Sequence, residues 1–107
     1  MRKRHETDMK SEDKIICATP TSGKKAKRID RWKFDAVRKA IVAALPCRGT
    51  GVLLEDLPNQ VERRLSAGDR ARLGSVKRYT AIVKLALEVR GEIIRVPGSK
   101  PQRLRRN

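Results

Sequence analysis

The chain has 107 residues and carries 27 Lys and Arg against 12 Asp and Glu, so its formal net charge is +15 at pH 7. This length fits one domain with tails and excludes two separate hydrophobic cores. The charge favours a polyanionic partner such as nucleic acid, an anionic membrane surface or an acidic protein. The apolar runs are too short to span a bilayer.

Residues that carry catalytic or metal chemistry are few. The chain has two cysteines, Cys17 and Cys47, and one histidine, His5, and their spacing suits neither a disulfide framework nor a metal site. We therefore predict a reduced cytoplasmic protein with no cofactor. Glu55 and Asp56 are adjacent, and neighbouring side chains on a helix diverge, so they form no acid–base pair. The sequence predicts that the protein is not an enzyme.

Residues 1–29 precede the main predicted domain. Residues 1–14 mix five basic with four acidic groups and offer little to bury, which predicts a disordered tail. Residues 15–29 are predicted to form an arm and a basic linker, in which Ile15 to Ala18 can form a short strand. A basic cluster in this linker resembles a nuclear localisation signal and equally an arm that grips nucleic-acid phosphates, although most such clusters are only solvated; it consists of Lys24, Lys25, Lys27 and Arg28.

A first helix is predicted from Asp30, a suitable N-cap, to Pro46, which stops it. Phe34, Val37 and Ile41 share one face with Ala44 and Leu45, and this face would join the core. The opposite face carries apolar side chains that are either covered by the N-terminal arm or form a weak homodimer contact: Trp32, Ala36, Ala40 and Ala43.

The middle of the chain predicts a second helix after a loop at residues 47–51. Val52 can form a short strand that pairs with the C-terminal hairpin, and Pro58 falls in the first turns of the helix, where a missing amide costs least. Residues 66–74 contain glycine and charges with weak periodicity, which predicts an irregular connection. The helix is marked by apolar residues at helical spacing: Leu54, Leu57, Val61 and Leu65.

A third helix is predicted between Ser75, an N-cap, and Gly91, which can adopt the left-handed conformation that ends a helix. Its predicted core face consists of Tyr79, Ile82, Val83, Ala86 and Val89. Its predicted exposed face consists of Lys77, Thr80, Ala81, Lys84 and Glu88. An exposed face with short and cationic side chains suits an element that lies in a DNA major groove, although most such faces only meet water.

The C-terminal residues predict a short basic hairpin. A β-branched run at residues 92–96 is followed by a turn at 97–101 and a return strand at 102–105. Helix, glycine stop and hairpin in succession predict a winged helix-turn-helix. The predicted DNA contacts outside the linker are Lys77, Arg78, Thr80, Lys84, Arg95, Lys100, Arg103, Arg105 and Arg106.

Several short segments resemble a small uncharacterised bacterial family, filed as a domain of unknown function. The resemblance spans roughly residues 14–106 and rests on residues 29–38, Leu45–Pro46, Gly51–Val52 and the run Leu87 to Gly91. It implies a winged-helix-like fold in a bacterial cytoplasm and implies no activity. Family members usually carry two Trp near the start of the third helix, where this chain has Arg78 and Tyr79.

Together these features predict an α+β, mainly helical fold. Residues 30–107 would form a three-helix winged-helix-like domain with a C-terminal hairpin as its wing. We predict DNA binding by a transcriptional regulator. Two alternatives stay open: a winged helix that binds protein and not DNA, and a non-specific nucleic-acid binder that uses its basic arm.

Overall fold

The computed structural model describes residues 14–18 and 27–107. The predicted disorder of residues 1–14 therefore falls outside the described residues, apart from Lys14, which begins a strand. Lys24 and Lys25 of the predicted phosphate-gripping cluster also lie outside them.

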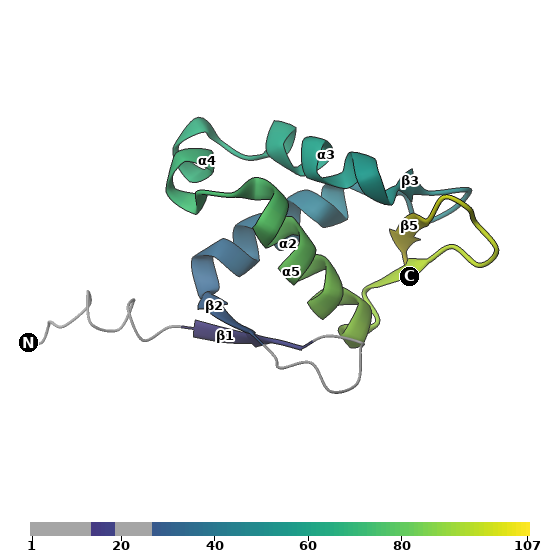
Figure 1. The fold of residues 1–107 in the computed structure, drawn as a ribbon, viewed down its shortest axis with the longest axis horizontal. Helices are drawn as coiled ribbons and strands as arrows, with labels where there is room; N and C mark the ends of the chain where they lie inside the picture. The colour runs from purple at the N-terminus through teal and green to yellow at the C-terminus, as the bar shows by residue number, and fades with distance from the viewer. Residues whose placement is uncertain (1–13, 19–26) are drawn as a thin grey trace, which may run out of the picture.

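The described chain is α+β and mainly helical (Figure 1). α5 crosses the middle of the molecule, with α3 and α4 along one side and the pair β1–β2 along another. In chain order the elements are β1 (Lys14–Cys17), β2 (Lys27–Asp30), α2 (Arg31–Ala44), β3 (Val52–Leu53), the 3-10 turn η1 (Leu54–Asp56), α3 (Leu57–Arg64), α4 (Ala67–Leu73), α5 (Val76–Arg90), β4 (Ile93–Arg95) and β5 (Arg103–Arg106).

The core lies where α2, α3 and α5 pack against one another. Most of the predicted core residues are buried there, and Tyr79 and Ile82 are partly buried against them. Burial of one such aliphatic side chain contributes about 1.5–3 kcal/mol to folding. Predicted core residues that are confirmed as buried are Phe34, Val37, Ile41, Leu57, Val61, Leu65, Val83 and Ala86.

The N-terminal arm packs on the helices as a two-stranded antiparallel hairpin, β1–β2. Cys17 and Ile29 are buried by it. Asp30 is the N-cap residue of α2, as predicted, but its side chain accepts no hydrogen bond from the first turn of the helix. The Asp30 carboxylate instead accepts from Lys14 Nζ at 2.6 Å, and this hydrogen bond lowers the pKa of Asp30 below its ordinary 3.8.

The C-terminal residues form a three-stranded antiparallel sheet in the order β3-β5-β4. Val52 lies opposite Leu104, which confirms the predicted pairing of a short strand with the hairpin. Gly51 precedes this strand with φ of 80°, and a Cβ there would collide with the Leu104 carbonyl oxygen. Only glycine fits this approach of the two backbones.

A helix missing from the sequence prediction, α4, occupies the connection at 66–74. Ser66 caps it, since its hydroxyl accepts from the backbone N–H of Asp69 at 3.0 Å. Only Leu73 of α4 is buried, which explains its weak apolar periodicity. The described residues thus form four α-helices, and the prediction of three is wrong.

The ends of α5 are as predicted, but its faces are not. Ser75 Oγ accepts from the backbone N–H of Arg78 at 3.1 Å, and Gly91 ends the helix with φ of 78°. Thr80 and Lys84, predicted as exposed, are 2% and 6% exposed, whereas Val89, predicted as core, is 49% exposed. α5 contacts α2, α3, α4, β1 and β4, so several of its faces are covered and a two-faced pattern describes it poorly.

The face of α2 opposite its predicted core is also partly covered. Ala40 is 3% exposed and belongs to the core, so its predicted place on a dimer face is wrong. Trp32 and Ala36 are half-buried against the core, and Ala43 is exposed. The continuous apolar patch that motivated the homodimer prediction is therefore absent.

Candidate nucleic-acid interface

Exposed cations gather where α4 ends and α5 begins. We call Arg70, Arg72, Lys77 and Arg78 the α4–α5 basic surface; all four are exposed. Residues 70–78 contain these four cations and no Asp or Glu. Gly74, with φ of 89°, lies in the short turn between the two helices, so the end of α4 directly precedes the start of α5 in the chain.

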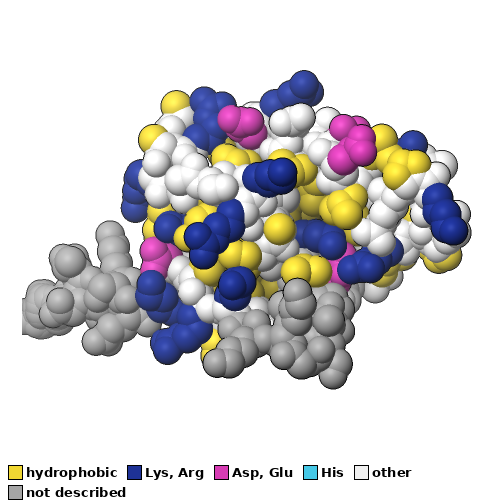
Figure 2. All heavy atoms as spheres, viewed as in Figure 1, with side chains coloured by type: hydrophobic (Ala, Val, Ile, Leu, Met, Phe, Trp, Pro, Cys, Tyr) yellow, Lys and Arg dark blue, Asp and Glu magenta, His cyan; other side chains and the backbone are white. Residues whose placement is uncertain are grey.

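None of these four cations makes an ion pair with a carboxylate of the described residues. The cations that do form such ion pairs are Lys14, Lys33, Arg38, Lys84 and Arg95. Figure 2 shows Lys and Arg side chains spread over the face where α4 and the first turns of α5 lie, with few acidic groups among them. The N-terminus of α5 adds its partial positive charge there. Unpaired cations beside a helix N-terminus favour a phosphate-bearing partner.

Two aromatic rings hold cations in this region. The guanidinium of Arg72 lies 4.3 Å from the centroid of the Trp32 ring, and Lys33 Nζ lies 4.8 Å from the centroid of the Tyr79 ring. Lys33 also donates to the Tyr79 hydroxyl at 3.3 Å. Such stacking restricts a side chain without neutralising its charge, so Arg72 stays available to an anion.

Two residues predicted to read DNA bases lie inside the molecule. Lys84 Nζ is 2.9 Å from Glu88 Oε2, and the side chains are only 8% and 9% exposed. Arg95, predicted as a wing contact, also binds Glu88, at 3.2 Å. Thr80 is buried, and its hydroxyl has no hydrogen-bond partner in the described part of the chain, which costs about 1–3 kcal/mol. The prediction that Thr80 and Lys84 lie on an exposed face of the third helix is therefore wrong.

The predicted arginines of the hairpin bind the loop that follows α2. Arg103 donates to the Gly51 carbonyl at 3.3 Å, Arg105 to the Cys47 carbonyl at 3.3 Å, and Arg106 Nε to the Leu45 carbonyl at 2.8 Å. These three are half-buried, and they fix the loop to β5. Lys100, at the hairpin turn, is exposed.

The remaining predicted contacts lie on the N-terminal arm. Lys27 and Arg28 are exposed on β2. The structure thus separates the predicted site: Lys77 and Arg78 are on the α4–α5 basic surface, Lys100 is at the hairpin turn, and the β2 cations are on the arm.

Sequence reasoning missed Arg70 and Arg72. Residues 47–74 hold five basic and four acidic residues, so this stretch looked nearly neutral. The acidic residues come mostly first, with Glu55, Asp56 and Glu62 ahead of the arginines. Counting charged residues within 70–78 alone would have revealed the four cations of the α4–α5 basic surface.

The described residues contain no group of three or more His, Cys, Asp or Glu placed to hold a metal ion. Burial raises the pKa of the Cys17 thiol, and the nearby Arg90 charge lowers it only partly, which keeps the thiol protonated. None of the described helices has both the length and the apolar character needed to cross a membrane.

Comparison with known proteins identifies a family but no activity. No curated protein and no solved structure matches this chain. Residues 14–104 match the family of unknown function DUF6958. The match covers the hairpin β1–β2, all four described helices and most of the C-terminal sheet. The chain therefore belongs to DUF6958, a family of unknown function.

Proposed function

We propose that this protein binds double-stranded DNA through the α4–α5 basic surface, as a winged-helix-like regulator. The observation that carries the proposal is the group of four exposed cations at residues 70–78 with no carboxylate partner among the described residues. The net charge of +15 is consistent with it.

The order of elements supports a winged-helix relationship. A helix, a short strand, further helices and a hairpin follow one another, and β3 pairs with β5 of the hairpin. In this proposal α5 corresponds to the recognition helix of a helix-turn-helix and the loop between β4 and β5 to the wing, with α4 as an addition. A place in a bacterial cytoplasm, which the sequence resemblance and the cysteines suggest, is part of the same proposal.

The burial pattern limits how such a protein would read sequence. The exposed polar side chains of α5 are Lys77 and Arg78 in its first turns and Arg90 in its last turn, while Thr80 and Lys84 are buried. Phosphate contacts would therefore dominate affinity, and base selection would rest on few side chains.

Fluorescence anisotropy with random duplex DNA at several salt concentrations tests the proposal. The variant Lys77→Gln/Arg78→Gln should lower the slope of log affinity against log salt by about two units, since each lost phosphate contact removes about 0.9. The matched control Lys39→Gln/Arg48→Gln removes two exposed charges elsewhere and should leave the slope nearly unchanged.

Equal losses from both double variants would contradict a localised interface. If the wild type does not bind DNA even at low salt, the protein-binding alternative replaces this proposal. Selection of particular genomic sites over random DNA would support the regulator role, whereas uniform binding would favour the non-specific alternative.

A further inference from the structure

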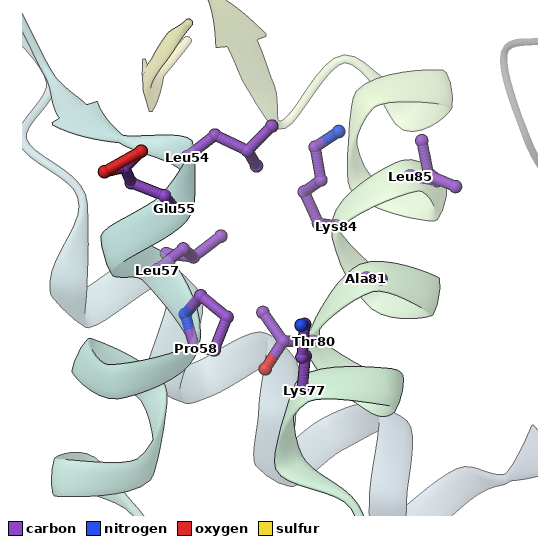
Figure 3. Close-up of a pocket in the computed structure, with 9 residues that line it drawn as sticks. All are labelled: Leu54, Glu55, Leu57, Pro58, Lys77, Thr80, Ala81, Lys84 and Leu85. Atoms are coloured by element: carbon purple, nitrogen blue, oxygen red, sulfur yellow. The ribbon is translucent and has the colours of Figure 1, made fainter. Parts of the chain in front are cut away.

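A pocket separates α5 from η1 and α3. Its volume is about 390 Å³, within the range of about 300–1,000 Å³ that small-molecule sites occupy. Figure 3 shows Leu54, Leu57 and Pro58 on one wall, facing Ala81 and Lys84 of α5 on the other. These side chains offer an apolar slot to a compact apolar group.

The pocket also contains a polar group that lacks a partner. The Thr80 hydroxyl is buried, makes no hydrogen bond with the other described residues, and points from α5 toward the Pro58 side of the pocket (Figure 3). Threonine hydroxyls on helices commonly bond to the preceding turn of backbone, so an unpaired one facing a pocket is available to a ligand.

Charge around the pocket indicates the kind of ligand. Lys77 lines it, is exposed, and makes no ion pair with the described residues. Lys84 lines it as well, with its charge shared with Glu88. Glu55 is the acidic residue of the lining, and its carboxylate turns away from α5 (Figure 3). The α5 wall is thus positive where the free hydroxyl lies.

We infer that this pocket binds a small organic carboxylate with an apolar body. The carboxylate would accept a hydrogen bond from the Thr80 hydroxyl and pair with Lys77, while the apolar body would lie between Leu57 and Ala81. The inference does not depend on DNA binding, and its test contains no DNA.

Two-dimensional ¹H–¹⁵N NMR titration of the full chain tests it, with 4-phenylbutyrate as the probe and 4-phenylbutyramide as its uncharged match. The acid should shift the amide resonances of Thr80 and Ala81 and saturate, and the amide should bind about tenfold more weakly, because it lacks the charge that pairs with Lys77. Equal binding of the two probes, or shifts confined to resonances outside the pocket, would overturn the inference.

Variants make the test specific to the site. Thr80→Val keeps the shape and removes the hydroxyl, and Lys77→Met removes the charge; each should weaken acid binding about tenfold. Ala81→Leu should fill the slot from an exposed position and abolish binding. Lys100→Met, at the exposed hairpin turn, is the charge-matched control and should leave binding unchanged.

NMR spectra recorded without the acid show whether each variant is folded and whether a second copy of the chain occupies the pocket. Thr80→Val should keep the dispersed spectrum and the melting temperature of the wild type, since it removes an unpaired buried hydroxyl. A Thr80→Val variant that is folded and binds the acid as the wild type does would contradict the inference. Pocket resonances that shift with protein concentration in the absence of acid would also overturn it, because a second copy would then be the occupant.

Discussion

The basic C-terminal hairpin and the α4–α5 basic surface carry similar charge but use it differently. In the hairpin, Arg106 donates to the Leu45 carbonyl at 2.8 Å, and Arg103 and Arg105 donate to carbonyls of the same loop. On the α4–α5 basic surface, Arg78 is exposed and unpaired with any carboxylate of the described residues. The arginines of the hairpin therefore stabilise the fold, whereas the cations of the α4–α5 basic surface are available to a partner.

The comparison shows that the number of cations in a segment does not measure its ability to bind phosphate. Arginine has several donors in a fixed geometry, so it readily satisfies carbonyls that a short loop leaves unpaired. The loop between α2 and β3 has little secondary structure of its own, and the hairpin supplies donors to it. Substitutions should therefore separate the two kinds of cation by their effects on folding and on binding.

The largest expected effect concerns Lys84, a cation bound inside the molecule. Glu88→Ala should lower the free energy of unfolding by about 3–5 kcal/mol, because it leaves the nearly buried Lys84 charge without its anion. Urea denaturation measures this, and Lys84→Met/Glu88→Leu should recover most of the loss. Glu62→Ala, on the exposed face of α3, is the control and should change stability by no more than about 0.5 kcal/mol.

If Glu88→Ala is as stable as the wild type, Lys84 must reach solvent readily. The Lys84–Glu88 ion pair would then hold the Lys84 side chain only weakly inside the molecule, and Lys84 would again be a candidate for DNA contact.

The next effect contrasts one arginine from each region. Arg106→Ala should lower the free energy of unfolding by about 1.5–3 kcal/mol, the range for hydrogen bonds of charged groups, and leave the salt slope of DNA binding unchanged. Arg78→Ala should leave stability within about 0.5 kcal/mol and lower that slope by about one unit. A drop in the slope from Arg106→Ala equal to that from Arg78→Ala would abolish the distinction between the regions.

The sequence predicted elements with strong local signals. Ser75 and Gly91 bound α5 because a hydroxyl cap and a left-handed glycine act within a few residues of the helix end. The hairpin followed from β-branched residues around a Pro-Gly turn. The pairing of Val52 with the hairpin was also predicted, and the structure shows that Gly51 allows the close approach of the two strands.

The predictions that proved wrong concern features that depend on tertiary contacts. The faces of α5 were assigned by treating Thr80 and Lys84 as solvent-facing, but Glu88 neutralises Lys84 in place and Thr80 lines a pocket. Helix α4 escaped prediction because it buries one residue and contains Gly68, which lowers helix propensity. No local pattern reports which side chains a neighbouring element will cover.

A smaller effect is expected for the Lys14–Asp30 pair, which joins β1 to β2 on the arm. The folded-state pKa of Asp30 lies below 3.8, so its contribution to stability is complete above that pH and is lost as pH falls through the folded-state pKa. Lys14→Met should cost less than about 1 kcal/mol at neutral pH, because both groups are partly exposed. The difference from the wild type should shrink below pH 3.8; a difference that grows on acidification would contradict this assignment.

Lys100 can show whether the contacts of a cation or its region of the molecule decide its role. Lys100 belongs to the basic hairpin by position, yet it is exposed and, unlike the arginines of β5, donates to no loop carbonyl among the described hydrogen bonds. If contacts decide, Lys100→Ala should leave the free energy of unfolding within about 0.5 kcal/mol, as Arg78→Ala does. If the hairpin acts as the proposed wing, the DNA affinity of this variant should fall alike on every sequence, and its salt slope should be lower by about one unit, because a wing meets phosphates and not bases. Arg103→Ala is the matched control from the same hairpin and should lose stability without losing slope. If Lys100→Ala instead behaves like Arg103→Ala, position in the hairpin outweighs the individual contact, and DNA would meet the protein at the α4–α5 basic surface alone.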